Sequence, residues 1–261
     1  MHDPNHPSSS KRRMLQQFYT TINNVAKPGD VVFFISERKT AIHSPLTRLY
    51  RRWQGLADHD ISMWHTAILV EPKKESRGAH VRPHIIHATK KGVEEIHIPP
   101  SFFKSIRDDP EGEPLQKSRI EIIQCPDLTS LQRQEIVRYA ITQIGKPFAE
   151  LGWRHDILTY ALGLPSRRLH PDRVSCHGLA FLAYQVVGFQ FPHRLKHAPF
   201  FNLARIFGRP LGHPFHEVNL QRLYLRDHHL YYDSRFKNIL RIFEDEETRQ
   251  ITLLHSPDKF S

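Results

Sequence analysis

Short apolar runs rich in β-branched and aromatic residues most constrain what this chain can fold into. The first, at 31–35 (VVFFI), follows the turn signal Lys-Pro-Gly-Asp, and the second is 64–70 (WHTAILV). Runs of this length and composition, bounded by turn residues, predict buried strands. Alternation of apolar and charged residues after Gly92 predicts an antiparallel partner strand. Further strands are expected at 85–88, 93–98 and 120–123.

Most of the clear helical patterning follows these strands. Thr129 and Gln132 have capping-box spacing, and Gly145 with Pro147 ends the helix that they begin. A second helix is expected to begin near Cys176, where an apolar stretch follows. The apolar face of the first helix is expected to consist of Val137, Ala140, Ile141 and Ile144. Other helical patterns occur at 14–25, 46–53 and 235–250.

Cys176 is the first candidate for chemistry, because it stands directly before an apolar helical stretch. Unpaired N–H groups at a helix N-terminus carry partial positive charge, which lowers the pKa of a thiol and favours the nucleophilic thiolate. A nearby imidazole would complete the activation. The alternative is that Cys176 is a buried small apolar residue, as lone cysteines usually are.

Two histidines lie on neighbouring predicted strands. His65 is near the start of the run 64–70, and His87 lies in the run 85–88. Antiparallel neighbours can bring the two imidazoles together, so that His65 acts as the base for the thiol and His87 holds it in its reactive tautomer. The chain has 19 histidines, so each of the two could instead be a core or surface histidine.

The order of these pieces resembles the permuted papain-fold amidases of the YiiX/YaeF-like group in the NlpC superfamily. The resemblance implies an α+β, circularly permuted papain-like (NlpC-type) fold over residues 27–190, with an antiparallel sheet packed against the helix that carries the nucleophile. Residues 1–26 are then an N-terminal lead with a short helix. Residues 191–261 are a C-terminal extension with an acidic tail, and this extension could serve as a cap or lobe. The matching segments are 27–30 (KPGD), 65–70 (HTAILV), 86–93 (IHATKKGV), 143–147 (QIGKP) and 175–180 (SCHGLA).

The chain departs from that group at three places. His87 stands where the group usually has glutamate, which is similar to the Cys-His-His set of lecithin:retinol acyltransferase-like relatives. His177 and Gly178 follow the cysteine where the group usually has Ser-Glu, and Phe148 stands where it often has tyrosine. These differences bear on the substrate more than on the fold. They leave a catalytically silent member that binds lipid or protein as the alternative.

The resemblance implies a cysteine-dependent amidase, peptidase-like hydrolase or acyltransferase that uses no cofactor. His65 would accept the thiol proton, Cys176 would attack an amide, ester or thioester carbonyl, and backbone N–H groups at the helix start would bind the oxyanion. The sequence assigns no side-chain oxyanion donor, acyl group or acceptor. A metal site at His213, His216 and Glu217 is disfavoured, because a proline lies between the two histidines and no HExxH motif occurs.

Net charge and composition limit the partners and the cellular location that can be expected. The net charge of +10 favours anionic partners such as a phospholipid surface, on which the basic apolar segment 200–209 could lie. Packing of this segment into a core is the alternative. No nucleic-acid module is recognised, so nucleic-acid binding is not expected, and the sequence predicts no oligomeric state.

Two cysteines and the lack of an apolar leader favour the cytoplasm. The acidic run 244–247 resembles the C-terminal signals of bacterial type IV secretion effectors. Delivery of the chain into a host cell is therefore a further hypothesis, and a solvated helix face is the alternative for this run.

Overall fold

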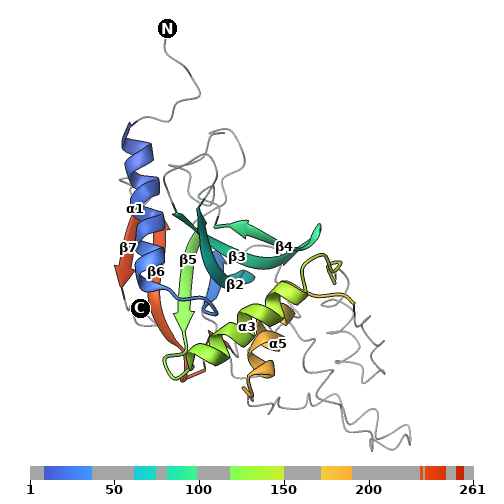
Figure 1. The fold of residues 1–261 in the computed structure, drawn as a ribbon. Helices are drawn as coiled ribbons and strands as arrows, with labels where there is room; N and C mark the ends of the chain where they lie inside the picture. The colour runs from blue at the N-terminus through green and yellow to red at the C-terminus, as the bar shows by residue number, and fades with distance from the viewer. Residues whose placement is uncertain are drawn as a thin grey trace, which may run out of the picture.

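Seven strands form one antiparallel sheet among the residues that the structure, a computed structural model, describes (Figure 1). These residues are 9–36, 62–74, 81–98, 118–149, 172–189, 230–231, 233–244 and 251–255. The strands are β1 (Val31–Ser36), β2 (Ser62–Lys74), β3 (Val81–Thr89), β4 (Gly92–His97), β5 (Ser118–Gln124), β6 (Lys237–Glu244) and β7 (Ile251–His255). Their order across the sheet is β4-β3-β2-β1-β5-β6-β7, and each neighbouring pair is antiparallel.

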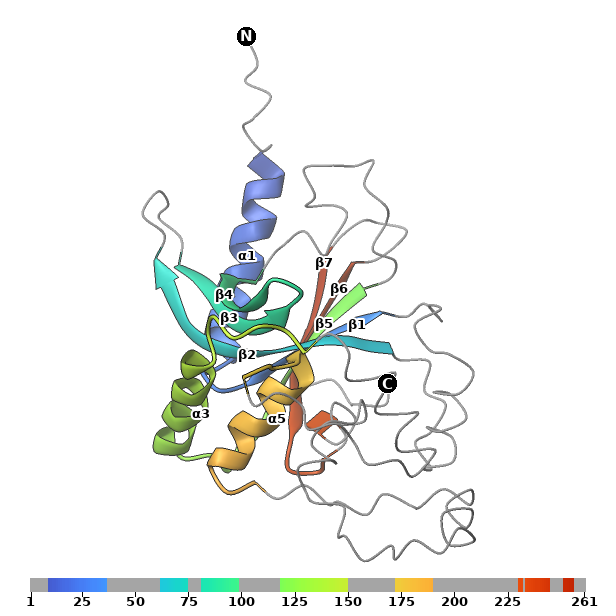
Figure 2. The same cartoon turned by 90° about the vertical axis from the view of Figure 1, so that its right-hand side faces the viewer.

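Helices of the described segments cover both faces of this sheet. They are α1 (Ser9–Val25), α3 (Ser130–Thr142) and α5 (Cys176–Val186). The helices α3 and α5 pack together on one face, and α1 lies on the opposite face (Figures 1 and 2). The chain is therefore a mixed α/β protein with an antiparallel sheet, as the order of its apolar runs predicts.

The pleat of the strands divides the core into two clusters. In β1, Val31, Phe33 and Ile35 pack in the cluster that contains α3 and α5, whereas Val32 and Phe34 pack in the cluster that contains α1. Successive side chains of a strand point to opposite faces, and all five are at most 1% exposed. Burial on both faces explains why the run 31–35 contains no polar residue.

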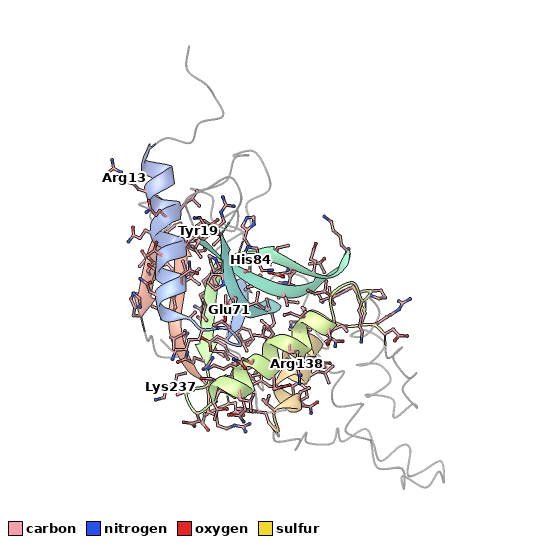
Figure 3. All side chains as sticks on the ribbon, in the orientation of Figure 1. Arg13, Tyr19, Glu71, His84, Arg138 and Lys237 are labelled. Atoms are coloured by element: carbon pink, nitrogen blue, oxygen red, sulfur yellow. The ribbon has the colours of Figure 1, made fainter. Side chains whose placement is uncertain are left out.

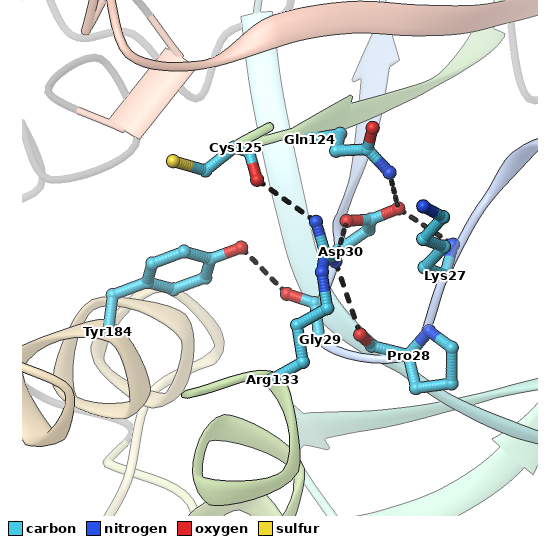
Figure 4. A network of polar contacts seen from close by, with 8 residues as sticks. All are labelled: Lys27, Pro28, Gly29, Asp30, Gln124, Cys125, Arg133 and Tyr184. Carbon is cyan, nitrogen blue, oxygen red and sulfur yellow. Dashed lines mark hydrogen bonds and ion pairs between the residues drawn. The ribbon is translucent and has the colours of Figure 1, made fainter. Parts of the chain in front are cut away.

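A buried ion pair joins the start of β1 to α3 (Figure 4). Asp30 accepts hydrogen bonds from Nη1 of Arg133 at 2.6 Å and from the backbone N–H of Lys27 at 2.8 Å. Arg133 also donates to the carbonyl of Cys125 at 2.9 Å. Burial raises the pKa of Asp30, and the hydrogen bond and charge of Arg133 act against that rise. An unpaired charge in the interior is costly, so this pair holds α3 against β1.

The turn before β1 requires glycine. Gly29 has φ of 88°, a left-handed conformation that side chains other than glycine rarely adopt. A Cβ atom at this position would lie 3.4 Å from the backbone of Arg133. The Pro-Gly-Asp turn of the sequence thus allows the close approach of α3 that the ion pair needs.

The predicted ends of α3 are confirmed. The backbone N–H of Gln132 donates to Oγ1 of Thr129, and the backbone N–H of Thr129 donates to Oε1 of Gln132, which is a complete capping box. Gly145, at φ of 86°, follows the end of the helix. The local signals for the beginning and the end of this helix were therefore sufficient.

The predicted apolar face of α3 is confirmed at Ala140, which is buried, and at Val137, which is partly buried against the core. It is wrong at Ile141 and Ile144, which are 51% and 42% exposed, whereas Ile136 is buried. The side chain of Arg133 must reach the buried carboxylate at the start of β1, and this contact rotates the face that includes Ile136 toward the sheet. A contact distant in sequence thus overrides the local apolar pattern.

The end of the chain supplies two strands. β6 pairs with β5 and β7 pairs with β6, so residues 237–244 and 251–255 extend the sheet that the earlier strands form. The helical pattern expected at 235–250 is therefore wrong for 237–244. Leu240 and Ile242 pack in the cluster of α1, and short apolar runs fit helix and strand periods equally well. Predictions that lie outside the described residues are the helix at 46–53, the segment 200–209, the histidines 213 and 216 with Glu217, and most of the acidic run 244–247.

Candidate active site

The helix that carries Cys176 begins at that residue. Ser175 is the N-cap, and its hydroxyl accepts a hydrogen bond from the backbone N–H of Gly178 at 3.0 Å. Near the other end of α5, the buried Tyr184 donates its hydroxyl hydrogen to the carbonyl of Gly29 at 2.6 Å (Figure 4). The cap and the tyrosine position α5 on the sheet, and Cys176 stands at the positive end of the helix dipole.

His65 lies on β2 beside an irregularity in the pairing with β1. Phe34 pairs with His65 and Ile35 pairs with Met63, so the register passes over Trp64. An extra residue of this kind bends the strand and re-aims the side chains next to it. The ring of His65 lies 5.4 Å from the ring of Phe34, between centroids, and is 9% exposed.

The structure brings His65 and His87 into contact. His87 pairs with Ala67 across the ladder of β2 and β3, which makes the two histidines diagonal neighbours. Nε2 of His65 and Nδ1 of His87 are 2.8 Å apart, and the rings meet edge to face with centroids 5.0 Å apart. Both side chains are buried, so one of these nitrogens donates its hydrogen and the other accepts it.

His87 is a neutral partner in this pair. Burial lowers its pKa to about 4, the charge of His65 acts in the same direction, and Glu94 acts in the opposite direction. At neutral pH His87 therefore carries a single ring N–H. A neutral imidazole of fixed tautomer can orient a second imidazole, as the third residue of a catalytic triad does.

The thiol of Cys176 lies against two imidazoles. Burial favours the neutral thiol, but the charge and hydrogen bond of His177, and the hydrogen bond and charge of His65, together outweigh it. The pKa of Cys176 consequently lies well below its usual value. The three residues selected from the sequence, Cys176, His65 and His87, thus form one connected group in the order thiol, imidazole, imidazole.

His177 is the member of this group that sequence reasoning missed. It follows Cys176 on α5, is 8% exposed, and has its Nδ1 atom 3.1 Å from Oγ1 of Thr66. Thr66 follows His65 on β2, so two consecutive residues of α5 meet two consecutive residues of the strand. In the sequence His177 was only a departure from a related pattern. Its place in the first turn of the helix, beside the thiol, was the signal that could have identified it.

The other cysteine has a different environment. Cys125 directly follows β5 and is 1% exposed. Burial raises the pKa of its thiol, although the backbone N–H of Asp127 acts against the rise. Its carbonyl accepts the hydrogen bond of Arg133. Cys125 therefore has a structural place between β5 and α3, and Cys176 is the cysteine with a lowered pKa.

Within the described segments no cluster of three or more histidine, cysteine, aspartate or glutamate side chains is arranged to hold a metal ion. No helix in the same segments is long and apolar enough to cross a membrane. Comparison of the chain with models of protein families, with curated proteins and with solved structures found no match.

Proposed function

We propose that this chain is a cysteine hydrolase or acyltransferase that acts on an amide, ester or thioester bond through Cys176, His65 and His87. The observation that carries the proposal is a thiol that begins a helix and lies against an imidazole, which is itself hydrogen-bonded to a second imidazole. A nucleophile, a base within hydrogen-bond reach and a group that orients the base are the three parts of covalent acyl transfer.

The first half of the reaction forms a thioester. His65 accepts the thiol proton, and the sulfur of Cys176 attacks the substrate carbonyl to form a tetrahedral intermediate. Backbone N–H groups in the first turn of α5 point out of the helix end and stabilise the oxyanion. The imidazolium of His65 then donates its proton to the leaving amine or alcohol as the carbonyl reforms. The acyl group is left on the sulfur.

The second half releases the acyl group. Water, or an alcohol or amine acceptor, attacks the thioester while His65 accepts its proton. The tetrahedral intermediate collapses, and the sulfur leaves as a thiolate. The thiolate again forms an ion pair with the protonated His65. Hydrolysis and acyl transfer differ only in the acceptor, so the same three residues serve both reactions.

The order of the elements supports a circularly permuted papain-like fold. A Pro-Gly-Asp turn leads into β1, His65 and His87 lie on the next two strands, and α3 precedes the helix with the cysteine. This order resembles the YiiX/YaeF-like group of the NlpC superfamily. The imidazole at position 87 is similar to that of the lecithin:retinol acyltransferase-like relatives. The net charge of +10 favours a substrate with anionic groups, such as a lipid at an anionic surface.

A chromogenic acetyl ester tests the proposal. When the protein reacts with 4-nitrophenyl acetate, we expect a burst of nitrophenol that is stoichiometric with protein, and an acetyl group on the peptide that contains Cys176. The Cys176→Ala variant should lose the burst, and the matched Cys125→Ala variant should keep it. A burst of equal size in both variants, or none in the wild type, would contradict an acyl-enzyme at Cys176.

A further inference from the structure

Glu94 lies on the far side of His87 from the thiol. It is the residue of β4 directly opposite His87, and its Oε1 atom is 3.5 Å from Nε2 of His87. This nitrogen is shielded from solvent, and no described group, Glu94 included, lies within normal hydrogen-bond geometry of it. The carboxylate is thus the polar group that the second ring nitrogen of His87 faces.

The carboxylate is held in place by a second contact. The hydroxyl of Thr89 donates to the same Oε1 atom at 3.2 Å. Thr89 ends β3 and Gly92 begins β4, and the two pair across the turn. Glu94 therefore lies two residues after a tight turn, and the pairing of β3 with β4 fixes its position opposite His87. Its side chain is 41% exposed, so the negative charge also remains in contact with water.

The position of the carboxylate determines where the proton of His87 lies. A neutral imidazole has one N–H and one lone pair. If the proton were on Nδ1, the lone pair of Nε2 would face a carboxylate oxygen at 3.5 Å, and two acceptors would repel each other. With the proton on Nε2, the N–H lies beside the negative charge of Glu94, which attracts it, and Nδ1 accepts a hydrogen bond from His65.

The tautomer of His87 also determines the tautomer of His65. If Nδ1 of His87 is the acceptor, Nε2 of His65 must be the donor across the 2.8 Å contact. The remaining nitrogen of His65, Nδ1, is then unprotonated and is the atom that can take the thiol proton of Cys176. A tautomer fixed at one end of the chain of contacts thus prepares the base at the other end.

We infer that Glu94 is a positioning residue that completes a relay from Glu94 through His87 and His65 to Cys176. The inference rests on the proposed function, because it describes how the same base is prepared. Glu94 does not take up the proton. Its charge stabilises the imidazolium of His65 through the intervening ring and so favours the pair of thiolate and imidazolium.

Three substitutions on one strand test the relay. Glu94→Gln removes the negative charge, and Glu94→Asp retains it. The matched control is Glu95→Gln, because Glu95 is the next residue of β4 and also faces a histidine. Its Oε1 atom is 3.1 Å from Nδ1 of His84, the histidine that Figure 3 labels. That carboxylate also pairs with Lys73, so the control removes a similar charge from a different cluster.

The first measurement is the pH dependence of alkylation of Cys176 by iodoacetamide. In Glu94→Gln we expect the rate at pH 7 to fall about two- to fivefold, as for loss of a partly exposed charge pair, and the pH of half-maximal rate to rise. Glu94→Asp should restore most of the rate, and Glu95→Gln should match the wild type.

The second measurement is independent of activity. Nitrogen NMR of protein labelled in its histidine rings distinguishes the two neutral tautomers, and the signals of His87 are those missing in His87→Asn. We expect the proton of His87 on Nε2 in the wild type. The tautomer should become mixed in Glu94→Gln.

The outcomes separate the relay from the proposed function. A wild-type Cys176 no more reactive than a free thiol would refute the proposed function, and the tautomer of His87 would still support or refute the role of Glu94. A reactive Cys176 whose rate and pH dependence are unchanged in Glu94→Gln would refute the relay alone. A proton on Nδ1 of His87 in the wild type would refute the relay as well.

Discussion

Acidification should destabilise the folded chain through His87. The pKa of His87 falls from 6.5 to about 4 in the fold, chiefly because burial disfavours the charged ring. Between these pH values the unfolded state binds a proton that the folded state does not, so stability is lost as the pH falls through this window and no further below it. Each unit of pKa corresponds to about 1.4 kcal/mol. His87 alone should therefore lower the free energy of unfolding by about 2 kcal/mol between pH 7 and 5, and by about 3 kcal/mol between pH 7 and 4.

Urea denaturation of the wild type and of His87→Asn, at several pH values between 7 and 4, measures this contribution. Asparagine offers an amide oxygen where Nδ1 of His87 accepts, but it does not titrate. Histidines that do not contact His87 contribute equally to both curves, so the difference between the two slopes reports His87 together with its coupling to His65. Curves that run parallel over the whole range would show that burial does not depress the pKa of His87, and the reasoning would fail.

Three other substitutions probe the parts that support the site. Arg133→Met leaves Asp30 buried without its partner and should lower the free energy of unfolding by about 3–5 kcal/mol in urea; a loss below about 1 kcal/mol would contradict the ion pair as a strong constraint. Gly92→Ala adds a Cβ atom 2.9 Å from the carbonyl of Lys146 at φ of 116°, and should cost about 1–3 kcal/mol in the same assay, whereas an unchanged midpoint would show that the turn adapts. His177→Ala removes a charge and a hydrogen bond from the thiol and should raise the pH at which alkylation is half-maximal; an unchanged midpoint would exclude His177 as a cause of the lowered pKa.

Local patterns predicted the features that depend on neighbours in sequence. The run 31–35 is apolar at every position because β1 is covered on both faces. The capping box of Thr129 and Gln132 is visible as residue types three apart. His65 and His87 lie on consecutive strands joined by a short segment, so their proximity follows from antiparallel pairing alone. These features need no knowledge of the distant parts of the chain.

Features that depend on distant contacts could not be predicted in the same way. Arg241 donates to the buried Glu121 at 2.8 Å, although nothing near either residue indicates the other. That contact accompanies the strand β6, whose apolar residues also fit a helix. The contact of Thr66 with His177 depends on how α5 lies over β2. Glu94 could not be selected until the register of β3 and β4 was known.

Alkylation of the two cysteines in the same molecules tests the activated thiol most directly. Iodoacetamide reacts with the thiolate, and mass spectrometry of peptides separates Cys176 from Cys125, which serves as the internal reference. Both are buried, so the pH of half-maximal rate is compared, and not the absolute rate. We predict a midpoint for Cys176 well below the value of about 8.5 for a free thiol, and a higher midpoint for Cys125. A midpoint for Cys176 at or above that of a free thiol would contradict the proposed active site.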